Sequence, residues 1–208
     1  MTPYNTVLTE VETEFTEKRS RFICAIKPVQ TADEAMAFIA ERKERHYDAR
    51  HTVYAYILRS GNVQRYSDDG EPQGTAGQPV LEVIRRSGLA DVCVAVTRYF
   101  GGILLGAGGL TRAYSNGASL AIAAAQRVCM CPCTDCRLEM DYAQYGIVSR
   151  LLPEHGAKLL ESDFGERVQL SVRLKTEDMP GFEKALIEAT SATVSAKVLG
   201  EVFSDMHV

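Results

Sequence analysis

The chain has 208 residues, of which 46% are hydrophobic and 24% charged, values typical of an ordinary soluble globular protein. The formal net charge of −4 excludes a generally basic nucleic-acid-binding protein. The charge is unevenly distributed, because residues 1–128 hold 15 basic and 14 acidic side chains whereas residues 129–208 hold 8 and 13. We therefore expect any site for a polyanion to be local and to lie in the first part.

The N-terminus has no basic stretch followed by an apolar run, and no apolar segment approaches the roughly 20 residues that span a bilayer. We therefore expect a cytoplasmic protein without a membrane partner. In that compartment six cysteines predict free thiols rather than disulfides.

Alternating apolar and polar residues, helix caps and turn residues predict the elements of the first part. In chain order these are strand 7–15, strand 20–27, helix 32–45, strand 51–58, helix 77–87, strand 92–97 and helix 110–126. Pro79 suits the first turn of the second helix. The third helix is rich in alanine, which predicts close packing against a sheet.

Pro132 interrupts the pattern, and we predict a linker over 129–135 between domains 1–128 and 136–208. The elements predicted for the second domain are strand 136–142, helix 143–155, strand 157–163, strand 167–174, helix 178–190 and strand 193–202. This βαββαβ order is the ferredoxin-like arrangement. The sequence therefore predicts an α+β protein with two domains.

Two stretches hold nine of the sixteen glycines: YSDDGEPQGTAGQP at 66–79 and TRYFGGILLGAGGLTRAYSNG at 97–117. Glycine is costly unless the backbone needs a positive φ or a close approach. GAGGLT at 106–111 precedes a predicted helix, where free N–H groups with Arg98 or Arg112 can hold a phosphate or another anion. The alternative is a tight turn that lets helix and sheet pack closely.

The first stretch contains Asp68, Asp69 and Glu71. These acids can bind a hard cation or act as acid and base, or they can form an Asx-turn that caps the loop. His51 ends HYDARH and opens a strand, and this segment can carry a catalytic His–Asp pair or a metal site, or it can form a polar helix exit. Tyr99, next to an arginine, can stack on a base or belong to the core.

Cys129, Cys131, Cys133 and Cys136 lie within eight residues, and the last two have zinc-knuckle spacing. A tetrahedral zinc site normally draws its ligands from two separate turns, and this segment lacks the second. Free thiols are therefore the preferred interpretation, although the sequence leaves open whether these four cysteines bind a metal. We expect no metal at the other candidate sites and no cofactor.

SRF at 20–22, HYDARH at 46–51 and the two glycine-rich stretches resemble the YigZ/IMPACT family, and DYAQYG at 141–146 resembles the second domain of its bacterial members. The resemblance runs through nearly the whole chain. It implies a first domain similar to a small-subunit ribosomal-protein domain and to domain IV of elongation factor G, and a second domain similar to the ferredoxin-like domain V of that factor. Many members have a lysine where Leu104 and Leu105 stand here, so one expected positive charge is absent.

These motifs define two predicted sets of site residues. The anion- or nucleic-acid-binding set is Arg98, Tyr99, Gly101, Gly102, Gly106, Gly108, Gly109 and Arg112. The remaining motif surface is His51, Asp68, Asp69, Gly70, Glu71, Gly74, Thr75, Gly77 and Tyr114.

The preferred functional hypothesis is a non-enzymatic, translation-associated regulator that binds RNA or the ribosome through the glycine-rich surface. Eukaryotic relatives regulate translation with an additional N-terminal domain that this sequence does not contain, so we do not expect their partner here. The alternative is an enzyme acting on a phosphorylated small molecule or nucleotide, because small-molecule kinases share the broad fold and a glycine turn at a helix start. A peptidase is discounted for want of a nucleophile or a metal-ligand set. The oligomeric state stays open.

Overall fold

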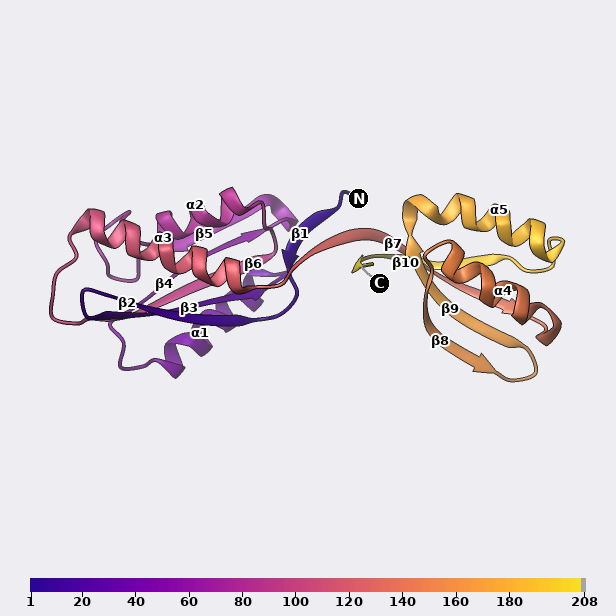
Figure 1. The fold of residues 1–208 in the computed structure, drawn as a ribbon, viewed down its shortest axis with the longest axis horizontal. Helices are drawn as coiled ribbons and strands as arrows, with labels where there is room; N and C mark the ends of the chain where they lie inside the picture. The colour runs from indigo at the N-terminus through magenta and orange to yellow at the C-terminus, as the bar shows by residue number, and fades with distance from the viewer. Residues whose placement is uncertain (207–208) are drawn as a thin grey trace. The chain divides into compact units, whose positions relative to one another are not determined.

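The computed structural model describes residues 1–206, which form two compact units. The first unit is Tyr4–Val128, and the second begins at Cys129 and includes Met1–Pro3. Each unit combines an antiparallel sheet with helices, so the chain has the predicted α+β fold with two domains (Figure 1).

The first unit is built on a five-stranded sheet in the order β2-β3-β6-β4-β5. Every neighbouring pair in this sheet is antiparallel. Its elements are β1 (Tyr4–Val7), β2 (Val11–Glu17), β3 (Ser20–Pro28), α1 (Ala32–Arg45), β4 (His51–Leu58), the 3₁₀ turn η1 (Ser60–Asn62), β5 (Val63–Ser67), α2 (Gly77–Ser87), β6 (Val92–Tyr99) and α3 (Ala107–Ala124).

Helices α2 and α3 cover one face of this sheet and α1 covers the other (Figure 1). Successive side chains of a strand point to opposite faces of the sheet, which explains why both faces are covered. Phe22 and Cys24 of β3 join the core with α2 and α3, while Ala25 joins the core with α1. Helix α3 lies close to the sheet: a Cβ added at Gly117 would be 2.7 Å from Cys24 Sγ. The small residues of α3 therefore allow the close packing that its composition predicts.

The second unit has the ferredoxin-like order β10-β7-β9-β8. Helices α4 and α5 share one core with the sheet through Val148, Leu152, Phe182 and Leu186. The elements are β7 (Arg127–Met140), α4 (Tyr142–Glu154), β8 (Lys158–Phe164), β9 (Val168–Lys175), the 3₁₀ turn η2 (Thr176–Asp178), α5 (Met179–Thr190) and β10 (Ala196–Asp205).

The predicted helices 32–45 and 77–87 and the predicted strand 51–58 are confirmed residue for residue. The single strand predicted over 7–15 is wrong, because residues 8–10 separate β1 from β2. Strand β5 is absent from the sequence prediction. Its residues, VQRYS, are half-buried or exposed, and they form a strand because they pair with β4 at the edge of the sheet.

The linker predicted over 129–135 is also wrong, since β7 runs through it without a break. Pairing with β10 extends from Met130 to Leu138, and Pro132 lies opposite Phe203. The fixed φ of proline is compatible with an extended backbone, and pairing with β9 begins only at Cys133. The sheet partners therefore hold this segment as a strand despite its proline.

Candidate anion-binding site

Asp68 organises the first glycine-rich loop through its carboxylate. One oxygen accepts a hydrogen bond from Gly74 N–H (2.8 Å), and the other accepts from Ala76 and Gly77 N–H (3.1 and 2.8 Å). These donors lie at the start of α2, where backbone N–H groups lack intrahelical partners. Asp68 therefore caps α2 from outside the helix.

Asp69 fixes the loop against β4. Its carboxylate accepts from Thr52 N–H and from Lys43 Nζ at 2.7 and 2.6 Å. The backbone carbonyl of Asp69 accepts from Nδ1 of His51 at 2.7 Å, so the His51 Nδ1 carries a proton. In the neutral imidazole, Nε2 of His51 is then free to accept a hydrogen bond.

Glu71 and Arg98 form a buried ion pair that joins the two glycine-rich stretches. Arg98 Nη1 donates to Glu71 Oε1 at 2.8 Å, and the side chains are 7% and 5% exposed. The buried Tyr114 hydroxyl, from α3, donates to the same Glu71 oxygen at 2.8 Å. Burial and the adjacent Glu71 carboxylate raise the pKa of Tyr114, so the phenol stays protonated. Arg98 is thus largely committed to an internal partner, although its Nε has none within residues 1–206.

The second glycine-rich stretch forms the loop from β6 to α3, and it packs on the turn between β2 and β3. A Cβ added at Gly101 would lie 2.0 Å from the carbonyl carbon of Arg19, so only glycine permits this crossing. Gly101 N–H also donates to Ser20 Oγ at 3.2 Å. The close crossing places the β2–β3 turn beside the start of α3, at the same end of the first unit (Figure 1).

The two glycine-rich stretches meet at a cavity of about 360 Å³ beside the start of α3, here named the α3 cavity. Its polar side chains are Arg50, His51, Glu71 and Arg98. The pairing of β4 with β6 explains this grouping, since His51 lies opposite Arg98 in the register. Strand pairing therefore joins residues that are 47 positions apart in the sequence.

The start of α3 completes the α3 cavity. Gly106 and Ala107 line it, and in the described part of the chain no side chain caps this helix. The first turn also lacks an acidic residue. Its N–H groups, including those of Gly108 and Gly109, therefore remain available to an anion.

Four exposed cations surround this region: Lys18, Arg19, Arg50 and Arg112, here named the basic edge. No ion pair involves any of them within residues 1–206. Lys18 and Arg112 line a second hollow of about 260 Å³, which shares Leu105 with the α3 cavity and also contains Glu17. The basic edge is thus a local excess of positive charge on a chain whose net charge is negative.

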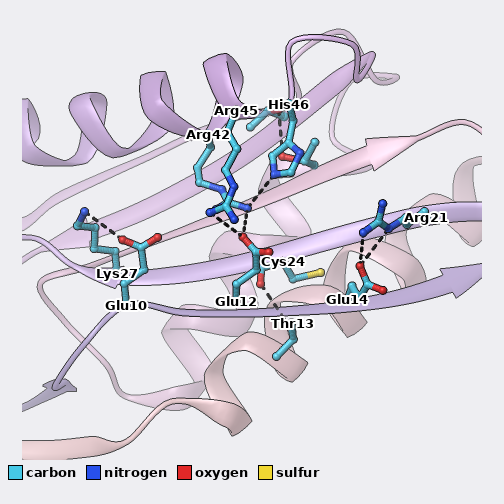
Figure 2. A network of polar contacts seen from close by, with 12 residues as sticks. Glu10, Glu12, Thr13, Glu14, Arg21, Cys24, Lys27, Arg42, Arg45 and His46 are labelled. Carbon is cyan, nitrogen blue, oxygen red and sulfur yellow. Dashed lines mark hydrogen bonds and ion pairs between the residues drawn. The ribbon is translucent and has the colours of Figure 1, made fainter.

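Tyr99 belongs to a chain of hydrogen bonds on the α1 side of the sheet. Its hydroxyl donates to Asp48 at 3.0 Å and accepts from Nδ1 of His46 at 3.0 Å. His46 Nε2 then accepts from Nη2 of Arg42 at 3.1 Å, and the same nitrogen of Arg42 pairs with Glu12 at 2.5 Å. Figure 2 displays Arg42 between Glu12 of β2 and His46 at the end of α1. Tyr99 is therefore tied into this network.

Other residues predicted for the site allow or stabilise the backbone conformation of the loops. Gly70, Gly74, Gly102 and Gly106 have φ between +71° and +85°. A Cβ at Gly77 would lie 2.7 Å from the Ser67 backbone. Thr75 donates to the Pro72 carbonyl at 2.6 Å. These residues shape the surface of the loop.

The described residues contain no group of three or more His, Cys, Asp or Glu side chains arranged to hold a metal ion. Cys133 and Cys136 are buried on β7, while Cys129 and Cys131 are half-buried with their sulfurs 4.0 Å apart. In addition, no helix among residues 1–206 has the length and apolar composition needed to cross a bilayer.

Sequence reasoning missed Lys18, Arg19 and Arg50 as members of the site. Lys18 and Arg19 lie in a turn with positive φ (44° and 65°), which no glycine marks. Arg50 is part of HYDARH, and its position directly before His51 was the signal that could have identified it. Arg98, expected to contact the anion, lines the α3 cavity, but its side chain is only 7% exposed and is paired with Glu71.

The comparisons with known proteins agree with this architecture. The Impact N-terminal domain family matches residues 18–122, and a domain family of unknown function, DUF1949, matches residues 138–193. A crystal structure described as that of a hypothetical protein is 30% identical with a TM-score of 0.63, covering 96% of this chain and 98% of that one. The chain is thus a two-domain α+β protein with an Impact-type first domain.

Two bacterial relatives extend the match to about nine tenths of the chain. IMPACT family member YvyE of Bacillus subtilis (strain 168) is 37% identical over 198 residues, 93% of this chain and 90% of that protein. IMPACT family member YigZ of Escherichia coli (strain K12) is 33% identical over 187 residues, 88% and 92% of the two chains. Protein IMPACT of Rattus norvegicus is 33% identical over 95 residues, 44% of this chain and 30% of that protein. The chain belongs to the IMPACT family.

The Glu71–Arg98 pair predicts a large stability effect. Glu71→Ala should lower the free energy of unfolding by about 3–5 kcal/mol, because it leaves a buried guanidinium without its countercharge. Urea denaturation measures this loss. Glu82→Ala, which removes an exposed pair with Arg85 on α2, is the control and should cost less than about 1 kcal/mol. Equal costs for the two variants would contradict the structural role of the pair.

The chain of hydrogen bonds through His46 predicts that the stability of the fold depends on pH. Burial and the nearby positive charge of Arg42 lower the pKa of His46. Protonation of Nε2 would also remove the acceptor that Arg42 uses. The unfolded chain then binds the proton more tightly, so stability should fall as the pH drops from above about 6.5 toward the lowered folded pKa. His46→Gln, which retains an acceptor and a donor, should remove this component. An NMR titration that placed the pKa of folded His46 at or above about 6.5 would refute the prediction.

Proposed function

We propose that the chain is a non-enzymatic, translation-associated protein that binds RNA or the ribosome through the basic edge and the α3 cavity. The observation that carries this proposal is the gathering of Lys18, Arg50 and Arg112 around an uncapped helix start, with the backbone of Arg19 packed against Gly101. Phosphate contacts from exposed cations and helix N-termini supply most non-specific affinity for nucleic acids. A cytoplasmic location is part of the proposal.

The translation context draws on the resemblance of the first domain to domain IV of elongation factor G, which is an argument from fold analogy. The net charge of −4 argues against binding over the whole surface. It does not argue against a local site, because electrostatic interactions beyond about 8–10 Å are screened at physiological salt.

The test is co-sedimentation with ribosomes and titration with labelled RNA at about 50–200 mM salt. Arg50→Ala/Arg112→Ala should weaken RNA binding about tenfold or more and should reduce the salt slope by roughly 0.7 for each lost contact with a single strand. Arg98 is left intact, since its removal would also break the buried pair with Glu71.

Lys184→Ala/Lys197→Ala is the matched control, because it removes the same charge from exposed positions on α5 and β10. It should leave binding within about twofold of the unaltered chain if the basic edge is the site. Absence of RNA and ribosome binding at low salt, or an equal loss in both double variants, would rule out the proposal.

The second candidate is an enzyme acting on a phosphorylated small molecule or nucleotide. Its supporting observation is the α3 cavity itself, whose volume of about 360 Å³ lies at the lower end of the range for small-molecule sites. His51, with Nε2 open, would be its acid–base group.

This candidate predicts thermal stabilisation by mononucleotides or sugar phosphates. A ligand at about 100 times its Kd stabilises the folded state by about 2.7 kcal/mol, and His51→Gln should reduce turnover more than it reduces this shift. Differential scanning calorimetry across such a panel, followed by a turnover assay, measures both. No shift with any compound would exclude the enzyme.

A further inference from the structure

The α3 cavity has a prominent apolar component that phosphate binding leaves unexplained. Beside Arg50 and His51, its lining includes Phe100, Leu104 and Pro72. A site for phosphate alone needs donors and positive charge, and it gains nothing from aliphatic or aromatic groups. The apolar lining therefore points to a ligand that carries a flat or apolar group next to its anion.

The loop that supplies this lining is exposed. Phe100 is 44% exposed, Ile103 is 41% and Leu104 is 81%. These three apolar residues are held in a short segment whose Gly102 and Gly106 have left-handed backbone angles. Large apolar side chains that stay accessible beside a cavity mark an interaction site more often than a random surface does.

Arg98 provides a further observation. Its guanidinium lies in the lining, 5.5 Å from the centre of the Phe100 ring, where a cation and an aromatic face attract one another. The side chain is 7% exposed and its Nε lacks a hydrogen-bond partner in the described structure. Phe100 is thus positioned by a buried cation while part of its surface remains accessible.

We propose that the α3 cavity holds a single unpaired nucleotide of RNA, an inference that rests on the proposed function. The base packs on Phe100 and Leu104, and its phosphate binds the open N-terminus of α3 together with Arg50. Nε2 of His51 is available to accept from a 2′-hydroxyl. The ligand class is therefore single-stranded, bulged or terminal RNA rather than duplex.

Duplex RNA does not match this lining. In an A-form helix the bases stay stacked, the major groove is too deep and narrow for side chains, and the outer surface offers phosphates and 2′-hydroxyls. Duplex RNA can therefore contact the cations of the basic edge, but it cannot contact the apolar lining of the α3 cavity. An unpaired nucleotide presents a π-face and a phosphate together, and base–aromatic stacking strengthens the binding of each base it engages.

The experiment compares four ligands by fluorescence anisotropy and competition at fixed salt: a single-stranded RNA of about 12 nucleotides, the same sequence as a duplex, AMP and inorganic phosphate. We expect the single strand to bind at least about tenfold more tightly than the duplex. AMP should compete weakly, because it lacks the neighbouring phosphates that the basic edge contacts.

Phe100→Ala should weaken single-strand binding about tenfold and leave duplex binding unchanged, while Phe100→Tyr retains the ring and should bind normally. Leu104→Ala should have a smaller effect in the same direction. Its control is Leu160→Ala on β8, another exposed leucine, which should have none. Thermal melting checks that each variant is folded. Leu104→Ala leaves the Phe100 ring in place, so it keeps the test decisive if Phe100→Ala unfolds.

Three other experimental results would each contradict a specific part of the proposal. Equal affinity for single strand and duplex, with loss in Arg50→Ala/Arg112→Ala, would leave RNA binding intact and refute the nucleotide pocket. If AMP bound as tightly as the oligonucleotide, the nucleotide-of-RNA proposal would be refuted, and the α3 cavity would be assigned to the small-molecule enzyme. Binding to anionic phosphatidylglycerol vesicles that depends on Leu104, with no RNA binding, would refute both RNA proposals in favour of a membrane surface.

Discussion

The buried Glu71–Arg98 ion pair is the interaction on which the arrangement of this site depends. It connects the loop before α2 to the end of β6, and the Tyr114 hydroxyl adds α3 to the same carboxylate. A buried charge without its partner is strongly destabilising, so these three elements are coupled. The signature acids and arginine thus hold the glycine-rich loops in place, and exposed residues around them are free to contact a ligand.

Charge is divided between the interior and the surface in this site. Asp68, Asp69 and Glu71 are satisfied by backbone donors, Lys43 and Arg98. Their negative charge is therefore largely compensated within the protein. Within residues 1–206 the cations of the basic edge form no ion pair, although Glu17 lies in the same hollow as Lys18 and Arg112, so a chain with a net charge of −4 presents a locally positive surface.

The order of elements was predictable because it depends on local patterns. Alternation and capping located α1, α2 and β4 correctly, and the βαββαβ order identified the ferredoxin-like unit. The failures occur where pairing with a distant strand overrides the local signal. Pro132 suggested a linker, yet β10 holds it in β7, and β5 exists because β4 lies beside it.

Residue types and their spacing were enough to predict the fold class, the family signature and the association of glycines with a helix start. Which arginine contacts solvent depends instead on the packing of the folded chain. The register of β4 against β6 places His51 opposite Arg98, Glu71 then neutralises Arg98, and the exposed role falls to Arg50 and Arg112. Burial and partnership depend on contacts between residues far apart in the chain, and no local pattern encodes them.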